Sequence, residues 1–196
     1  MPEILTKTVI FEKPGKSNTS RTLEISQARA SELNLKNILV ATTMGDTGLL
    51  AAQMFRGCNV VVITHSTGFR EPNMQEVSES KRKEIEAAGA KVLTCQHALG
   101  GVNRAVRRKF ETYQLDEIIA HTLRTQGQGM KVVYEIALMA ADAGLSPAGE
   151  AVLCIAGTGR GADTAVLLQP AHAHDFFDIK LLEILCHPAA DHPGFH

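Results

Sequence analysis

The sequence predicts a three-layer α/β fold built around a doubly wound, mainly parallel sheet that ends in an antiparallel hairpin. Short β-rich runs alternate with longer helical stretches, and this alternation is typical of sheets with helices on both faces. The run 37–41 is apolar throughout its centre, as expected of a strand covered on both faces. The late runs 151–155 and 165–168 are separated by a glycine-rich stretch instead of a helix, which favours a hairpin.

The first half of the chain supplies the parallel part of the predicted sheet. A first strand, 8–11, ends at Lys13-Pro14-Gly15-Lys16, and Asn18 or Thr19 is suited to cap a helix that runs to about Leu33. The elements predicted next, in order, are the strand 37–41, the helix 46–55, the strand 59–64, a loop over 68–73, a charged helix that ends near Gly89, and the strand 91–94.

The second half begins with helices and ends with strands. Gly100 and Gly101 open a helical region that continues over 115–124 and 130–143. Two strands follow, 151–155 and 165–168. The last apolar run, 181–185, suits a strand or a helix equally, and we expect a flexible tail over 188–196. We expect one domain over residues 1–196.

Composition excludes several classes of protein. The net charge is −1, and 21% of the residues are charged, so bulk electrostatics argue against a nucleic-acid partner. No window approaches eighteen consecutive apolar residues, so we expect no membrane partner. The four cysteines are widely spaced, which favours free thiols and, with no signal-peptide pattern at the N-terminus, a cytoplasmic location.

Metal-binding patterns are weak. His172 and His174 stand near Asp175 and Asp178, and Cys186 stands near His187. Neither group supplies four ligands at a recognised spacing. We therefore expect no metal site.

The turn over 42–47 has the strongest phosphate-binding pattern in the chain. Thr42 and Thr43 follow a predicted strand, and Gly45 and Thr47 stand where a helix begins. The free N–H groups of a first helical turn favour an anion, and glycine lets the backbone approach a phosphate closely. The same residues suit a plain cap by Thr43 or Asp46 equally well. Asp46 repels a phosphate unless its carboxylate faces away or meets a ligand hydroxyl.

Two further loops carry candidate ligand-binding groups. Residues 64–70 supply hydroxyls, the ring of Phe69 and the cation of Arg70, and Phe69 suits stacking on a planar ligand or a hydrophobic plug. Residues 157–164 are rich in glycine, and Arg160 could meet a phosphate there, although a plain hairpin loop explains the pattern too. Their glycine spacing and the strand that follows do not match a dinucleotide fingerprint, and no P-loop sequence occurs.

Charged residues on two predicted helices leave a choice between a pocket and a solvated face. Lys131 and Glu135 are four residues apart and share a helix face. They suit a pocket, although a solvated face is the commoner arrangement. The basic stretch from Arg104 to Lys109 is interpreted as a solvated face, with a contact to an anion or to RNA as the alternative. No catalytic acid, base or nucleophile stands out.

Several short motifs occur together over nearly the whole chain. They are Lys13-Pro14-Gly15 with Asn18-Thr19, Gly45-Asp46-Thr47, Thr67-Gly68-Phe69, Met139-Ala140-Ala141-Asp142, Arg160-Gly161-Ala162-Asp163-Thr164-Ala165, and the segment from His172 to Asp178. In combination they resemble the stand-alone proteins that are similar to the C-terminal α/β domain of pyruvate kinase. The resemblance implies a doubly wound α/β fold and association with flavin mononucleotide (FMN).

The resemblance does not imply pyruvate kinase activity. The catalytic (β/α)₈ barrel of those enzymes takes about 250 residues, and this chain has 196. Met44 and Asp46 replace positions that are often basic or small in the allosteric turn of pyruvate kinases, and this favours a ligand with one phosphate over a bisphosphate. Any enzymatic activity is expected to be that of a flavin-dependent oxidoreductase.

We therefore expect a protein that binds FMN, a small phosphorylated ligand, and that is able to form a homo-oligomer. The expected cofactor-binding residues are Asn18, Thr19, Thr42, Thr43, Gly45, Asp46, Thr47, Thr64, Thr67, Gly68, Phe69, Gly129, Lys131, Glu135, Gly157, Thr158, Gly159, Arg160, Gly161, Asp163 and Thr164. The alternative is a non-catalytic regulatory module that senses a phosphorylated metabolite or nucleotide. A phosphatase or hydrolase that uses Asp46 or Asp163 is a third hypothesis.

Overall fold

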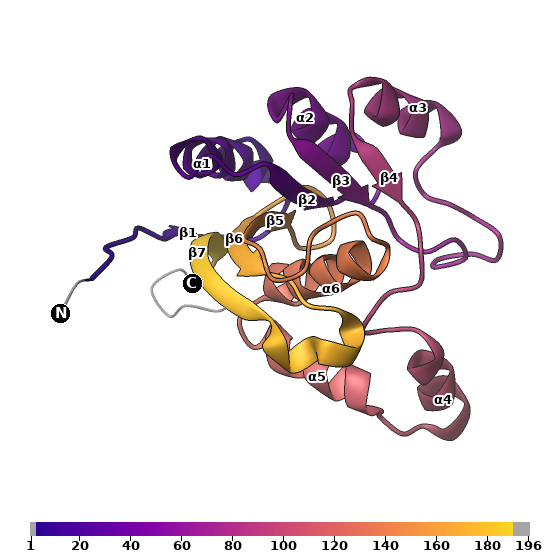
Figure 1. Cartoon of the computed structure of the whole chain (residues 1–196). Helices are drawn as coiled ribbons and strands as arrows, with labels where there is room; N and C mark the ends of the chain where they lie inside the picture. Colours follow the sequence, from indigo (N-terminus) through magenta and orange to yellow (C-terminus); the bar gives the residue numbers. More distant parts are fainter. Residues whose placement is uncertain (1–2, 190–196) are drawn as a thin grey trace.

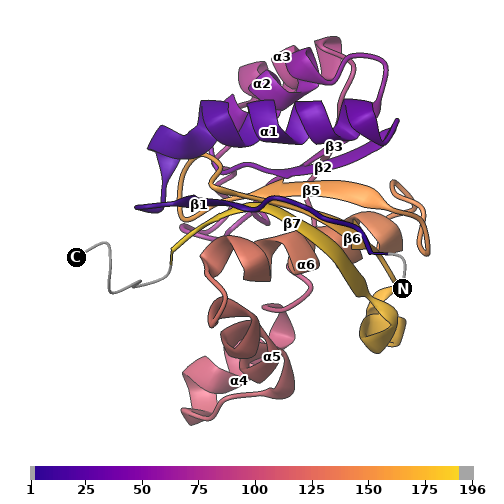
Figure 2. The same cartoon turned by 90° about the vertical axis from the view of Figure 1, so that its left-hand side faces the viewer.

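A computed structural model describes residues 3–189, which form a seven-stranded sheet with helices on both faces (Figures 1 and 2). The strand order is β1-β7-β6-β5-β2-β3-β4. The strands are β1 (Val9–Phe11), β2 (Asn37–Ala41), β3 (Asn59–Ile63), β4 (Lys91–Leu93), β5 (Val152–Ala156), β6 (Thr164–Gln169) and β7 (Lys180–Pro188).

The sheet is mainly parallel, with antiparallel pairing around β6. Strand β2 pairs in parallel with β3 on one side and with β5 on the other, and β3 pairs in parallel with β4. Strands β5 and β6 form the predicted antiparallel hairpin. The segment 181–185 belongs to β7, which inserts antiparallel to β6 and parallel to β1. The predicted fold class is therefore confirmed.

Helices cover the two faces unequally. Helices α1 (Thr19–Glu32), α2 (Asp46–Met54) and α3 (Glu79–Ala87) lie on one face. Helix α6 (Gln128–Asp142) covers the other, and α4 (Val102–Phe110) and α5 (Leu115–Arg124) lie beyond it (Figure 2). The short 3₁₀ helices Lys16–Asn18 and Ala173–Asp178 were not predicted. Asn18 precedes α1 but makes no capping bond, and its side-chain amide N–H donates to the Lys13 carbonyl at 2.7 Å.

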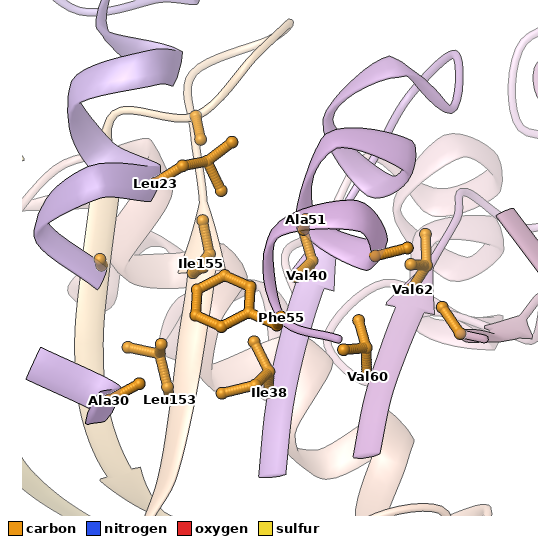
Figure 3. Packing of buried hydrophobic residues seen from close by; sticks show 14 of the residues in the cluster. Leu23, Ala30, Ile38, Val40, Ala51, Phe55, Val60, Val62, Leu153 and Ile155 are labelled. Atoms are coloured by element: carbon orange, nitrogen blue, oxygen red, sulfur yellow. The ribbon is translucent and has the colours of Figure 1, made fainter. Parts of the chain in front are cut away.

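The continuous apolar runs of the central strands are explained by two cores. Ile38 and Val40 of β2 point toward α1 and α2, where they pack with Leu23 and Phe55 (Figure 3). Leu39, between them, points to the opposite face and packs in the cluster that contains residues of α6. Successive side chains of a strand alternate between faces, so a strand covered on both faces needs apolar residues at every position.

Three further sequence-based expectations concern the C-terminal tail, the cysteines and membrane-spanning helices. Pro188 is the last residue of β7 and pairs with Phe11, so the predicted tail begins at least one residue too early. Residues 190–196 of that tail lie outside the described residues. All four cysteines are unpaired, with Cys154 and Cys186 buried and the other two half-buried. No helix within residues 3–189 combines the length and apolar composition that crossing a bilayer requires.

Asp163 joins three segments of the chain at the end of the β5–β6 hairpin. Its carboxylate is fully buried. One oxygen accepts from the backbone N–H of Gly15 at 2.8 Å and of Thr158 at 3.1 Å, and the other accepts from the Thr164 hydroxyl at 2.8 Å. These bonds fix the glycine-rich loop against the segment that precedes α1.

We predict that Asp163→Ala lowers the free energy of unfolding by about 2–4 kcal/mol, because it leaves several buried donors without an acceptor. Urea unfolding measures this change. Asp178→Ala is the matched control: Asp178 is exposed, and its loss is expected to change stability by less than about 0.5 kcal/mol. Equal effects of the two substitutions would show that the buried bonds of Asp163 contribute nothing.

Candidate functional site

The candidate site lies at the carboxyl edge of the central parallel strands. The loops that follow β2, β3 and β5 meet there, together with the segment after β4 and the N-terminal end of α6. Ligands of open α/β sheets bind at this edge, where the order of the strands reverses. A cavity of about 260 Å³ lies between the loops, and we call it the main cavity. Its walls are Ala41, Thr42, Thr43, Ile63, Thr64, His65, Phe69, Arg70, His97, Arg104, Arg124, Gln128, Lys131, Val132, Glu135, Ile136, Met139, Gly157, Gly159 and Gly161.

The walls of the main cavity combine apolar side chains with an excess of positive charge. Ile63, Ile136 and Met139 supply an apolar surface, and threonines supply hydroxyls. Four cationic side chains line the cavity, against the single carboxylate of Glu135. This composition suits a ligand that carries a flat or apolar part and negative or hydrogen-bond-accepting groups.

The most deeply placed charges are Lys131 and Glu135, one turn apart on α6. Their side chains form an ion pair and are each only 5% exposed. Glu135 also accepts a hydrogen bond from the backbone N–H of Leu99 at 3.1 Å. Burial lowers the pKa of Lys131, and Glu135 opposes that shift. A solvated face is therefore the wrong interpretation of this pair.

Lys131 keeps hydrogen-bonding capacity for a ligand. An ammonium group has three N–H donors, and within residues 3–189 Glu135 is the only group that accepts a hydrogen bond from the Lys131 ammonium. The ammonium lies in the wall of the main cavity. Its remaining donors suit an acceptor atom of a bound molecule.

His97 is held neutral beside this ion pair. Burial lowers its pKa to about 4. Its Nε2 accepts a hydrogen bond from the backbone N–H of Ser66 at 3.2 Å, so the proton of the neutral ring is on Nδ1, which lies 3.7 Å from the Glu135 carboxylate. The ring of Phe69 stacks on His97 with 4.9 Å between centroids. His97 therefore positions the loop after β3 and the ring of Phe69.

A buried carboxylate shapes the other end of that loop. Glu76 has a side chain that is 5% exposed, and it holds His65 Nδ1 at 2.5 Å and Arg70 Nε at 2.8 Å. His65 is also in contact with Phe69, with 4.3 Å between ring centroids. The loop thus presents one face of packed rings to the main cavity.

A second concave site lies over the N-terminus of α2, and we call it the α2 hollow. It has a volume of about 220 Å³. It shares Thr42, Thr43 and Gly161 with the main cavity, so the two sites adjoin. The full set of lining residues is Lys16, Thr19, Ser20, Thr42, Thr43, Met44, Asp46, Thr47, Leu50, Arg160 and Gly161.

Gly45 sets the geometry of this turn. Its φ of 96° is in the left-handed region, which favours glycine. Its N–H donates to the Thr42 hydroxyl at 3.1 Å. The Thr43 hydroxyl donates to the Gly159 carbonyl at 2.9 Å and joins the turn to the glycine-rich loop. The free N–H groups of the first turn of α2 lie at the α2 hollow and favour an anion there.

The predicted cofactor-binding residues fall into three groups. Those in the main cavity are Thr42, Thr43, Thr64, Phe69, Lys131, Glu135, Gly157, Gly159 and Gly161. Those in the α2 hollow are Thr19, Thr42, Thr43, Asp46, Thr47, Arg160 and Gly161. Those that line neither site are Asn18, Gly45, Thr67, Gly68, Gly129, Thr158, Asp163 and Thr164.

Several residues of the third group have a structural role or line another hollow. Gly129 packs against Thr164, where a Cβ atom would collide with the threonine side chain. Asp163 has both carboxylate oxygens occupied. Thr67 and Gly68 line a different hollow, next to the main cavity.

Sequence reasoning left several lining residues out of the expected site. Arg104 was interpreted as part of a solvated face, but its guanidinium lies 5.2 Å from the ring centroid of Phe69 and lines the main cavity. His97 follows β4 at the same edge of the sheet, and its place just after a predicted strand could have indicated a site residue. The other lining residues outside the expected site are polar (His65, Arg70, Arg124 and Gln128) or apolar (Ala41, Ile63, Val132, Ile136 and Met139).

A doubly wound sheet with a cationic cavity at its carboxyl edge is thus the class that the structure defines. The family model described as the pyruvate kinase alpha/beta domain matches residues 21–168. The chain belongs to this family.

Solved structures that resemble the chain include much longer proteins. Pyruvate kinase from Cryptosporidium parvum is 14% identical, with a TM-score of 0.35, over 87% of this chain and 23% of that one. A hydrogen sulfide-producing enzyme from Fusobacterium nucleatum is 16% identical, with a TM-score of 0.28, over 62% of this chain and 46% of that one. This chain spans less than half the length of either protein.

The low pKa of His97 predicts a pH dependence of stability. The folded-state pKa, about 4, lies below the ordinary value of 6.5, so the unfolded chain binds more protons between these values. The contribution of His97 to stability is complete above pH 6.5 and declines as the pH falls toward 4. Between pH 7 and 5, we predict that the wild type loses about 1–2 kcal/mol more stability than His97→Gln.

Urea unfolding of the two proteins at both pH values measures this difference. Titrating groups common to both proteins cancel in the comparison. Equal losses for the wild type and His97→Gln would contradict the assignment of a buried neutral imidazole.

Proposed function

We propose that this protein binds FMN, with the phosphate over the N-terminus of α2 and the flavin ring in the main cavity. The observation that carries the proposal is that an anion-binding hollow and a partly apolar cavity adjoin through Thr42, Thr43 and Gly161. Each site alone is smaller than the roughly 300 Å³ at which ligand pockets begin. Together they suit an elongated ligand with a phosphate at one end.

The phosphate end is supported by donors and positive charge in the α2 hollow. Arg160 and Lys16 line it, and so does the Thr47 side chain. Asp46 opposes an anion, but part of its charge is balanced by Lys81. The pKa of Lys81 is raised mainly by its hydrogen bond to Glu84 and to a smaller extent by the Asp46 carboxylate. These features support one phosphate group at this position.

The ring end is supported by the walls of the main cavity. Ile63, Ile136 and Met139 suit the apolar half of a flavin, and the free donors of Lys131 suit the acceptor atoms of its polar half. FMN, when bound, supplies hydride or single-electron transfer. The residues of this chain would bind and orient it.

One observation favours a second candidate, a regulatory module that binds a phosphorylated metabolite without a flavin ring. The ring of Phe69 is already stacked on His97 and lies under the guanidinium of Arg104. A sugar phosphate needs no aromatic surface. A melting temperature that rises with a sugar phosphate and not with FMN would favour this candidate.

The phosphatase hypothesis has less support. Asp163 is fully buried, and its two carboxylate oxygens accept three hydrogen bonds. A nucleophilic carboxylate needs a free oxygen. We therefore do not propose Asp163 as a nucleophile.

We predict that Arg160→Ala weakens FMN binding about tenfold and leaves the affinity for riboflavin unchanged, because riboflavin lacks the phosphate that the guanidinium would contact. Quenching of flavin fluorescence measures both affinities. Gly45→Asp is a less informative variant, because any side chain at Gly45 is strained and meets Lys81.

The matched control is Arg56→Ala, which removes an exposed arginine just after the C-terminal end of α2. It is expected to leave both affinities unchanged. Equal weakening of FMN and riboflavin by Arg160→Ala, or no weakening of either, would contradict the placement of the phosphate.

A further inference from the structure

We propose that a hollow beside the main cavity binds the carboxylate or phosphate group of a small organic acid. We call it the α4 hollow, because it lies between the loop after β3 and the N-terminal end of α4. Its volume is about 500 Å³. It is lined by Ser66, Thr67, Gly68, Phe69, Thr94, Cys95, Gln96, His97, Gly100, Gly101, Arg104 and Arg108.

The charge of the α4 hollow is positive. Arg104 and Arg108 are one turn apart on α4, so they share a face of the helix. None of the residues that line the hollow carries a carboxylate. Within residues 3–189, neither arginine forms a salt bridge. Two unpaired guanidinium groups thus face a concave surface.

Two acidic side chains of α5 contact residues of α4 other than Arg104 and Arg108. Glu117 of α5 pairs with Arg107 at 2.6 Å. Asp116 accepts a hydrogen bond from the Asn103 amide at 2.5 Å. Arg107 is therefore paired with a carboxylate of α5, whereas within residues 3–189 neither Arg104 nor Arg108 has such a partner.

Two glycines at the start of α4 lie against long side chains of the hollow. A Cβ atom at Gly100 would collide with the guanidinium of Arg104, and one at Gly101 would collide with the side chain of Gln96. Both glycines line the hollow. Without side chains at these positions, Arg104 and Gln96 can lie along its wall.

Hydrogen-bonding groups complete the site. Ser66, Thr67 and Thr94 contribute hydroxyl-bearing side chains to the lining, and the Thr94 hydroxyl also shares a hydrogen bond with the Thr64 hydroxyl at 2.7 Å. Guanidinium groups bind carboxylate and phosphate oxygens with paired hydrogen bonds. An organic acid with such a group can therefore bind the arginines and accept hydrogen bonds from the hydroxyl groups of the hollow.

The position of the α4 hollow suggests its role. It shares Phe69, His97 and Arg104 with the main cavity, so a ligand in either site touches the same three side chains. If FMN occupies the main cavity, an anionic co-substrate in the α4 hollow lies next to it. This role rests on the proposed function, whereas the anion site itself does not.

The test uses malonate and inorganic phosphate as probes, added at constant ionic strength to the full-length protein without FMN. Backbone amide resonances are followed by NMR. We expect the signals of Gly100 and Gly101 to shift in a saturable way with at least one probe. Arg108→Ala should weaken that binding about tenfold, and the control Arg56→Ala should leave it unchanged.

Two results would overturn the proposal: no saturable shift with either probe, or the same affinity in the wild type and Arg108→Ala. A parallel FMN titration of the wild type separates the two proposals. Anion binding without FMN binding would support the α4 hollow and contradict the proposed function, and FMN binding without anion binding would do the reverse.

Discussion

The parallel pairing of β2 with β3 on one side and β5 on the other determines where the functional groups of this protein lie. Because the three strands run in the same direction, the loops that follow them end at one edge of the sheet. Residues separated by more than a hundred positions meet there, and the bond from Thr43 to the Gly159 carbonyl is one example. The candidate sites are therefore consequences of strand order.

Positive charge and burial determine which groups at the carboxyl edge of the sheet can bind a ligand. Lys131 and Glu135 hold two opposite charges below the surface, and the burial that lowers the pKa of Lys131 also keeps His97 neutral. A buried charge is costly unless it is paired and hydrogen-bonded. Glu135 meets this requirement through Lys131 and the N–H of Leu99, while Lys131 retains donors for a ligand.

The fold was predictable because the central strands are apolar at every buried position. The range of β2 and that of α5 agree with the prediction residue for residue. The segment 181–185 was ambiguous because its pattern is inverted: Leu182 is 51% exposed, whereas the Glu183 side chain is only 9% exposed and pairs with Arg29 of α1. The salt bridge between Arg29 Nη2 and Glu183 Oε2, 2.9 Å long, explains why a strand carries a glutamate on its covered face.

The site was less predictable than the fold, because it too depends on tertiary contacts between segments far apart in the sequence. Turns such as 42–47 carry a local signal, since glycine and hydroxyl residues next to a helix start favour anions. Lys131 with Glu135 has the spacing of an ordinary solvated pair, and Arg104 belongs to a basic helix surface. Their place in the main cavity depends on how α4 and α6 pack against the sheet, and sequence spacing does not encode that packing.

The most direct test of the central claim is the visible absorption spectrum of the purified protein, before and after addition of FMN, with mass spectrometry of the supernatant after heat release. If the protein binds FMN as proposed, the purified protein shows a flavin spectrum and the supernatant contains FMN. A colourless protein that also fails to take up added FMN would contradict the proposal.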